Sequence, residues 1–200
     1  MCSPPLREDP AEQAAIWQGV KNGTFTILSS DHAPSKYNHP QGKLRGLAYG
    51  PERDGRFRHI PNGLPGVETR LPLLFSGGVV TGRITPQRFV ELTATNPAKL
   101  YGFRNKGILA PGYDADIVIW HNQETFEPFT LTNEKLHHAI DYTPFDGFEF
   151  RNWPKYTLVR GKVVFSEGKI IGDMGYGRFV KRQSSLLPVL RHGRQSEWRL

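Results

Sequence analysis

The chain has 200 residues, a net charge of +7 and a hydrophobic content of 38%. This length can bury one core and allows one domain or two small ones. Because no apolar run approaches eighteen residues, the sequence predicts no membrane span. Cys2 is the single cysteine, which excludes an internal disulfide framework. Since the first residues do not resemble a secretion signal, we expect a cytoplasmic protein.

The positive charge is concentrated at the C-terminal end. Residues 175–200 hold six basic residues and one acidic residue, and the rest of the chain is nearly balanced. No interleaving of aromatic and basic residues, of the kind that stacks on nucleic-acid bases, stands out. We therefore predict no nucleic-acid partner and interpret the basic stretch as a solvated or interface-forming tail.

Residues 9–31 have the pattern of one helix-to-strand unit of an α/β protein. The run Asp9-Pro10-Ala11-Glu12 supplies an N-cap, a proline at the first helical position and a glutamate at N3. The predicted helix ends near residue 22, because Gly23 suits the position after a helix. Residues 24–29 then alternate β-branched and apolar side chains, which predicts a short buried strand.

A long stretch at 33–66 is rich in proline, glycine, asparagine and charge, including Lys43. A segment of this composition predicts a functional loop outside the core. An apolar segment follows at 67–75. The pairs Thr85-Pro86 and Asn96-Pro97 each predict the start of a helix.

From Gly107 onward the sequence is punctuated by glycine and rich in β-forming residues. We expect strands at 115–120, 157–165 and 169–171, which together indicate a small β-module. The residues after 183 carry little periodicity and are expected to be mobile.

The tetrapeptide Ser30-Asp31-His32-Ala33 directly follows the first predicted strand. In a (β/α)8 barrel, chemistry collects at the C-terminal ends of the strands, where side chains converge. Asp31 is therefore a candidate metal ligand or base. The alternative is that Asp31 only caps the segment that follows it.

Several separate motifs occur along the chain. They are, in order, Cys2-Ser3-Pro4-Pro5-Leu6-Arg7, Ser30-Asp31-His32, Ile60-Pro61-Asn62-Gly63-Leu64-Pro65-Gly66-Val67-Glu68, Thr95-Asn96-Pro97-Ala98-Lys99, Lys106-Gly107, Gly112-Tyr113-Asp114-Ala115-Asp116 and Gly175-Tyr176-Gly177-Arg178-Phe179-Val180-Lys181-Arg182. In this combination and order, they resemble the dihydropyrimidinase and hydantoinase family of the amidohydrolase superfamily.

This resemblance implies an α/β fold with three parts. Residues 1–106 would form the C-terminal part of a metal-dependent amidohydrolase (β/α)8 TIM barrel. Residues 107–182 would supply strands of a small β-sandwich and an oligomerisation arm, and 183–200 a disordered tail. The arm at 176–182 would reach a neighbouring subunit of a homotetramer. We expect the chain to be a piece of a longer enzyme, inactive alone and prone to associate through exposed strand edges.

The resemblance also implies a chemistry, the ring opening of 5,6-dihydropyrimidines or hydantoins by a hydroxide that bridges two Zn²⁺ ions. Asp31 would ligate one metal ion and pass a proton from the hydroxide to the leaving nitrogen. Ser3 and Asn62 would hold the substrate, largely through backbone groups. The implied partner is a small cyclic amide or imide, and no membrane is involved.

The family's other metal ligands lie upstream of the motifs found here. They are a His-X-His pair, a carboxylated lysine and two later histidines, and this chain contains no His-X-His pair. We interpret His32 as a hydrogen-bonding support and His137-His138 as surface residues. Asp114 and Asp116 are interpreted as turn residues, because aspartate bonds readily to nearby backbone groups.

Two other functions fit parts of the pattern. An allantoinase-type hydrolase would act on a related ureide, but the Asn62-Gly63 loop argues against it. A non-catalytic scaffold could use the same fold without hydrolysis, and the presence of Asp31 and Asn62 disfavours that alternative.

Overall fold

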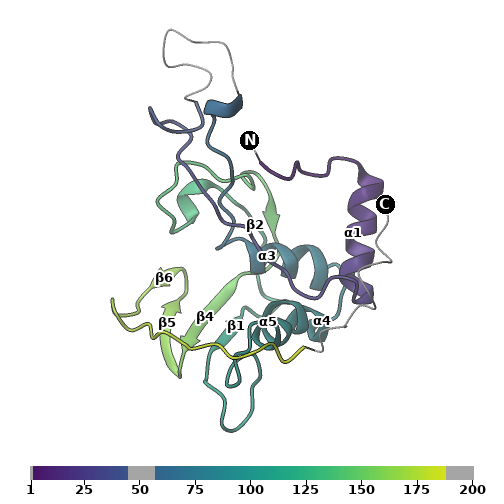
Figure 1. Cartoon of the computed structure of the whole chain (residues 1–200), viewed down its shortest axis with the longest axis vertical. Helices are drawn as coiled ribbons and strands as arrows, with labels where there is room; N and C mark the ends of the chain where they lie inside the picture. Colours follow the sequence, from purple (N-terminus) through teal and green to yellow (C-terminus); the bar gives the residue numbers. More distant parts are fainter. Residues whose placement is uncertain (1, 45–56, 188–200) are drawn as a thin grey trace.

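The computed structural model describes residues 2–44 and 57–187. Its helices gather on one side, and a four-stranded antiparallel sheet lies beside them (Figure 1). Short 3₁₀ helices occur at Phe57–His59 (η1) and Asn133–Lys135 (η4). Within the described residues, no helix has both the length and the apolar character that crossing a membrane requires.

Helix α1 runs over Pro10–Asn22 and confirms the first predicted helix with both of its ends. The Asp9 carboxylate accepts a hydrogen bond of 2.8 Å from the backbone N–H of Ala11. Gly23 has a φ of 95°, a left-handed conformation that glycine adopts without a steric penalty. Capping by side-chain chemistry is local, which is why the sequence predicts it well.

The predicted strand at 24–29 is wrong, because these residues belong to no strand of the described chain. Leu28 N–H donates to the carbonyl of Leu92 at 3.1 Å, and a single isolated parallel bridge joins His32 to Leu64. A strand requires a neighbour that continues its ladder of hydrogen bonds. The described residues provide only these separate contacts beside the segment.

Two longer helical segments follow, and each contains a π turn. α3 (Arg70–Leu74) continues into η2 (Phe75–Val79), while α4 (Pro86–Val90), η3 (Glu91–Thr95) and α5 (Asn96–Leu100) form one continuous rod. The predicted start at Thr85-Pro86 is confirmed, since the Thr85 hydroxyl accepts from the N–H of Arg88. α5 begins at Asn96 as predicted, but it continues η3 without a break, because Thr95 and Asn96 both have helical backbone angles.

The π turn explains how the rod accommodates Pro97. It also explains how the rod holds the segment that leads to Asp31. Asn96 N–H donates to the carbonyl of Glu91, one residue further back than in an α-helix. Pro97 has no N–H to donate. The carbonyl of Leu92 is thereby left without a partner inside the helix, and it accepts the N–H of Leu28 instead.

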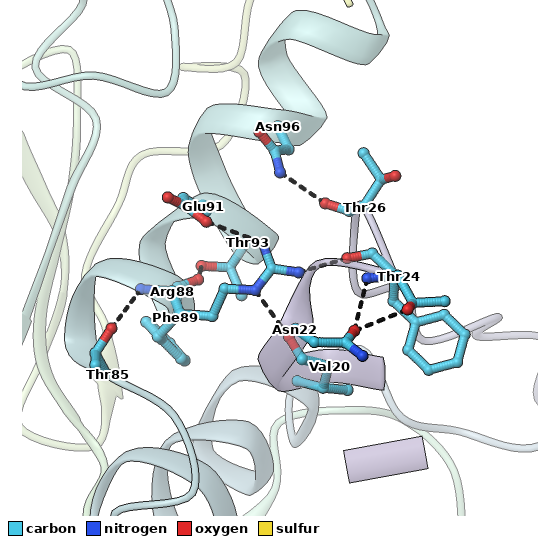
Figure 2. Close-up of polar contacts among 11 residues, drawn as sticks. Val20, Asn22, Thr24, Thr26, Thr85, Arg88, Phe89, Glu91, Thr93 and Asn96 are labelled. Carbon is cyan, nitrogen blue, oxygen red and sulfur yellow. Dashed lines mark hydrogen bonds and ion pairs between the residues drawn. The ribbon is translucent and has the colours of Figure 1, made fainter. Parts of the chain in front are cut away.

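Side chains of the rod satisfy further backbone groups of this segment, as Figure 2 shows. The Arg88 guanidinium donates to the carbonyl of Val20 at 2.8 Å and to that of Phe25 at 2.6 Å. Its remaining arm pairs with Glu91 at 2.9 Å. Asn96 Nδ2 donates to the carbonyl of Thr26 at 2.9 Å. These donors take the place of a strand neighbour.

The core lies between the helices and the first strand of the sheet. Its buried members are all apolar, namely Val20, Leu74, Ile84, Phe89 and Leu92. The Trp120 ring stacks on Phe75 with centroids 4.2 Å apart, and Phe89 meets Trp120 edge-on at 5.6 Å. Since Trp120 ends a strand, this aromatic cluster joins the sheet to the helices.

The four-stranded sheet has the order β1-β4-β5-β6 and is antiparallel throughout. Its strands are β1 (Ile117–Trp120), β4 (Pro154–Val159), β5 (Lys162–Ser166) and β6 (Lys169–Ile170). The predicted strands are confirmed, with 157–165 divided by a tight turn at Arg160-Gly161, where both residues have positive φ. A two-stranded sheet of β2 (Phe129–Thr130) and β3 (Glu149–Phe150) was not predicted.

Two expectations for irregular regions need correction. Lys43 is buried, with 6% of its surface exposed, although the loop at 33–66 was expected to stay outside the core. Part of that loop, 45–56, lies outside the described residues. At the expected disordered tail, Gln183 and Leu186 donate backbone hydrogen bonds to Gly102 and Lys99. The rest of the tail, 188–200, also lies outside the described residues.

We predict that Arg88→Ala accelerates amide hydrogen exchange in residues 20–28 by roughly 10- to 100-fold, because two backbone carbonyls lose a charged donor. Hydrogen-exchange mass spectrometry measures this directly. Gln87→Ala, an exposed neighbour on the same helix, is the control and should change exchange little. Equal exchange in both variants would contradict the role assigned to Arg88.

Candidate functional site

Asp31 has two properties that suit a ligand-binding carboxylate. Its backbone φ is 44°, in the left-handed region, which costs a non-glycine residue of the order of 1 kcal/mol. Its side chain is exposed, and it makes no hydrogen bond or ion pair with any of the described residues. Backbone strain of this kind clusters at functional sites, and the carboxylate is available to a ligand.

His32 connects the Asp31 segment to the loop that carries Asn62. Its imidazole Nδ1 accepts hydrogen bonds from the backbone N–H groups of Gly66 at 3.0 Å and Val67 at 3.2 Å. The next residue, Ala33, donates its N–H to the carbonyl of Leu64 at 3.2 Å. The interpretation of His32 as a hydrogen-bonding support is confirmed.

Gly63 allows the two segments to approach this closely. A Cβ atom at position 63 would lie 2.1 Å from the carbonyl oxygen of Ala33, far inside van der Waals contact, and the φ of Gly63 is 99°. Only glycine fits both the space and the backbone angle. The exposed side chain of Asn62 therefore belongs to a loop whose backbone packs against the residues after Asp31.

Lys43 holds the residue before Asn62. Lys43 donates from Nζ to the carbonyl of Pro61 at 3.0 Å, next to Asn62. Burial lowers the pKa of Lys43, and its electrostatic interaction with Cys2 opposes that shift. Ser3, the residue after Cys2, is exposed. The hydrogen bonds among the described residues join the Asp31 segment to the Asn62 loop, and they do not tie Ser3 to either segment.

A cavity of about 220 Å³ lies behind the Asn62 loop. Its walls include His32, Gly66, Glu68, His137 and His138. None of the three predicted site residues lines this cavity, so it is distinct from the surface that Asp31 presents.

Glu68 and His137 close one wall of the cavity with a bidentate contact. His137 Nδ1 lies 2.7 Å from one carboxylate oxygen of Glu68, and the backbone N–H of His137 donates to the other at 2.8 Å. His137 Nε2 lies 3.0 Å from the carbonyl oxygen of Gly168. The hydrogen bond that the His137 ring donates to the Glu68 carboxylate raises the pKa of His137, whereas burial lowers that of His138. The sequence interpretation of these histidines as surface residues missed this contact.

Asp141, in the same segment as His137, holds the loop that follows Asp31. Its two carboxylate oxygens accept hydrogen bonds from the backbone N–H groups of Tyr37 at 2.7 Å and Asn38 at 2.8 Å. The segment 131–143 thus contacts both the loop after Asp31 and the loop after Asn62. Sequence reasoning missed it because the partners are separated by about a hundred residues and form no local motif.

The carboxylate pair Asp114 and Asp116 is structural. Lys106 Nζ lies 2.9 Å from Asp114 and 2.5 Å from Asp116. Asp116 also accepts the backbone N–H of Arg160 at the β4–β5 turn. Burial raises the pKa of Asp116, but the hydrogen bond from Lys106 and the other contacts outweigh it and leave the pKa lowered. These carboxylates have partners already, in agreement with their interpretation as turn residues.

A metal ion needs more donors than the described part of the chain brings together. Among residues 2–44 and 57–187, no group of three or more His, Cys, Asp or Glu side chains could hold a metal ion. Asp31 is a single oxygen donor of the type that zinc accepts. The described residues could therefore supply one ligand to a larger site.

The sequence pattern of the amidohydrolase family matches residues 10–164. This match covers more than half of the chain. The chain belongs to the amidohydrolase family. The D-phenylhydantoinase of Escherichia coli O81 (strain ED1a) is 41% identical over 189 residues, which are 94% of this chain and 38% of that protein.

Solved structures of the family agree with this assignment. The D-hydantoinase from Bacillus sp. AR9 is 38% identical, with a TM-score of 0.81. The match covers 92% of this chain and 38% of the D-hydantoinase chain. The dihydropyrimidinase from Brevibacillus agri is 36% identical with a TM-score of 0.81 and the same coverage. The predicted amidohydrolase fold class is confirmed, and the chain spans about 38% of the length of these relatives.

We predict that Gly63→Ala displaces the Asn62 loop, because the new methyl group meets backbone and not a movable side chain. Gly112→Ala is the matched control, since Gly112 has a φ of 87° with open space around its Cβ position. The control should cost about 1 kcal/mol from backbone strain alone. In Gly63→Ala, hydrogen exchange in residues 60–67 should rise by roughly tenfold beyond any change in the control. Equal behaviour of the two variants would refute the close approach.

We predict that the Glu68–His137 contact weakens with rising pH. The pKa of His137 is raised in the folded chain, so this contribution to stability is complete below about pH 6.5 and is lost as the pH rises through the raised value. NMR titration should show the pKa of His137 moving down in Glu68→Gln. Glu127→Gln, which alters an exposed carboxylate, should leave it in place. An unchanged pKa in Glu68→Gln would count against the ion pair.

Proposed function

We propose that the chain supplies the C-terminal part of an enzyme that opens the ring of hydantoins or 5,6-dihydropyrimidines. The observation that carries the proposal is the pairing of the Asp31 segment with the Asn62 loop through His32 and Ala33. An exposed, unpaired carboxylate at the end of one segment thus lies beside a loop held by its backbone. The relatives named D-phenylhydantoinase and dihydropyrimidinase support this substrate class.

Asp31 is the residue that would bind metal. Two Zn²⁺ ions, when bound, would lower the pKa of water and polarise the carbonyl group of the substrate. The Asp31 carboxylate would provide an oxygen ligand to one of them. A carboxylated lysine from a part of the enzyme outside this chain would supply a further ligand. Asp31 has no competing partner among the residues that the structure describes, which fits this role.

Asp31 would also move the proton that ring opening requires. Attack of water on the ring carbonyl releases a proton, and cleavage of the carbon–nitrogen bond leaves a nitrogen that must gain one. A carboxylate between the two can accept the proton and donate it to the leaving nitrogen. The net reaction adds one water molecule and forms a carboxylate and an amide or ureido group.

Ser3 and Asn62 would orient the substrate. Both residues are exposed, and the contact of Lys43 with Pro61 holds the chain next to Asn62, which supports a role for nearby backbone N–H and C=O groups in binding. A cyclic imide carries alternating carbonyl and N–H groups, which such backbone groups complement. Because the backbone would do most of the binding, Asn62→Ala should be milder than a change that moves the loop.

The division of the chain and its assembly belong to the same proposal. Residues 1–106 would complete the barrel of a cytoplasmic enzyme, and 107–182 would add sandwich strands and an arm of a homotetramer. Phe179 in this arm is 94% exposed, whereas Tyr176 is held under the Arg160 guanidinium at 4.3 Å. An anchored base with an exposed apolar side chain further along suits an arm that contacts another subunit.

We predict that an active enzyme results when residues 2–187 replace the matching segment of the Bacillus sp. AR9 D-hydantoinase. This chimera should hydrolyse hydantoin or dihydrouracil in the presence of Zn²⁺. Asp31→Asn should reduce kcat/KM by roughly 10³-fold or more, because a ligand and a proton carrier are both lost.

Asp146→Asn is the control, since Asp146 is exposed and distant in sequence from every predicted site residue. Its kcat/KM should stay within about twofold of the unmodified chimera. An Asp31→Asn chimera that retains full activity would refute the role of Asp31. A folded, zinc-loaded chimera that hydrolyses neither substrate would refute the proposed function.

A further inference from the structure

We infer that His32 is a positioning residue, which fixes the substrate loop relative to Asp31 through the Nδ1 atom of its ring. The inference rests on the proposed function in one respect, namely that the Asn62 loop holds substrate. It adds a role for a side chain that would neither bind metal nor carry a proton.

The hydrogen bonds define the protonation state that this role needs. Both bonds to His32 Nδ1 come from backbone N–H groups, those of Gly66 and Val67. An N–H group can only donate, so Nδ1 must be the unprotonated nitrogen of a neutral ring whose proton is on Nε2. A single ring nitrogen therefore satisfies two adjacent backbone donors.

The donor Gly66 lies where the Asn62 loop meets helix α3. Gly66 is also the residue whose carbonyl accepts from Arg70 N–H at 3.0 Å and from the Thr69 hydroxyl at 3.3 Å. Gly66 therefore joins the loop to the start of α3, and His32 holds that junction.

Asn62 lies between two fixed points of the loop. On one side, Lys43 holds the carbonyl of Pro61. On the other, the Ala33–Leu64 bond and the two bonds to His32 hold residues 64–67. All three hydrogen bonds of the second group come from the two residues that directly follow Asp31. Any movement of the loop away from Asp31 must break them.

Removal of the His32 ring would leave two N–H groups without this acceptor, and of the three hydrogen bonds between the loop and the residues after Asp31 only the Ala33–Leu64 bond would remain. The carboxylate of Asp31 makes no hydrogen bond or ion pair with His32. The loss should therefore weaken substrate binding more than it affects the chemical step, and it should raise KM while kcat changes little.

Two substitutions separate the position of the acceptor from the mere presence of a polar group. In His32→Asn, the side-chain oxygen occupies the place of Nδ1 and can still accept from the loop. In His32→Gln, the oxygen extends toward the place of Nε2 and cannot. His32→Ala removes both positions. His39→Ala is the matched control, because His39 Nδ1 also accepts a backbone N–H, that of Gln41, but within the distant part of the long loop.

The first measurement is hydrogen exchange in the full 200-residue chain, followed in peptides that contain residues 64–68. We expect His32→Ala and His32→Gln to accelerate exchange by roughly tenfold or more, with His32→Asn and His39→Ala within about threefold of the unmodified chain. If all four variants exchange at the same rate, or if Asn fails to rescue while Gln does, the positioning role is overturned.

The second measurement is the kinetics of the same variants in the chimera. We expect KM to rise about tenfold in His32→Ala and His32→Gln, with kcat within about threefold, and both constants to recover in His32→Asn. A fall in kcat alone, with KM unchanged, would overturn the inference and would assign His32 to the chemical step.

The two measurements separate failure of the inference from failure of the proposed function. Exchange in residues 64–68 reports the contact between His32 and the loop and does not require any activity. If exchange responds as expected but the unmodified chimera hydrolyses neither substrate, the proposed function fails and the positioning of the loop stands. If the chimera is active and exchange does not respond, the inference fails and the proposed function stands.

Discussion

The chain is organised around one constraint, the need to satisfy backbone N–H and C=O groups of segments that have no strand ladder. Outside a ladder, each backbone N–H and C=O group must bond to a side chain or to water, and only a side-chain partner also fixes the position of the segment. Here side chains supply the missing partners. Arg88 and Asn96 do so for the residues before Asp31, His32 does so for the Asn62 loop, and Asp141 does so for the loop at Tyr37.

This arrangement concentrates rigidity where a ligand would bind. Asp31 has a left-handed backbone and a carboxylate that bonds to none of the residues in 2–44 and 57–187, and the segments on both sides of it are held by charged or polar side chains. A hydrogen bond in which the donor or the acceptor is charged is stronger than one between two neutral groups. Arg88 as a donor and Asp141 as an acceptor are therefore well suited to hold irregular backbone. The aromatic contact of Trp120 with Phe75 and Phe89 joins the sheet to the same helices.

Features that depend on neighbouring residues in the sequence could be predicted. The caps of α1 and α4, the Arg160-Gly161 turn and the strands around it follow from local backbone preferences. Asp31 and Asn62 were proposed as site residues because they lie in recognisable motifs, and their roles stay predictions. The contacts of His137 with Glu68 and of Asp141 with Tyr37 could not be found, because no local preference records a partner far along the chain. The prediction of a strand at 24–29 was wrong for the same reason, since the hydrogen-bond ladder of a strand depends on residues far along the chain.

The contacts that hold the segment before Asp31 depend on the π turn in the α4–α5 rod, and therefore on the number of residues in this helix. A π turn is equivalent to one residue inserted into an α-helix, and here it frees the Leu92 carbonyl that holds Leu28. Deleting one residue between 91 and 95 would restore a regular α-helix and rotate every later side chain by about 100°. Asn96 would then face away from Thr26. A protein engineer who transplants the Asp31 motif must therefore transplant the irregular helix with it.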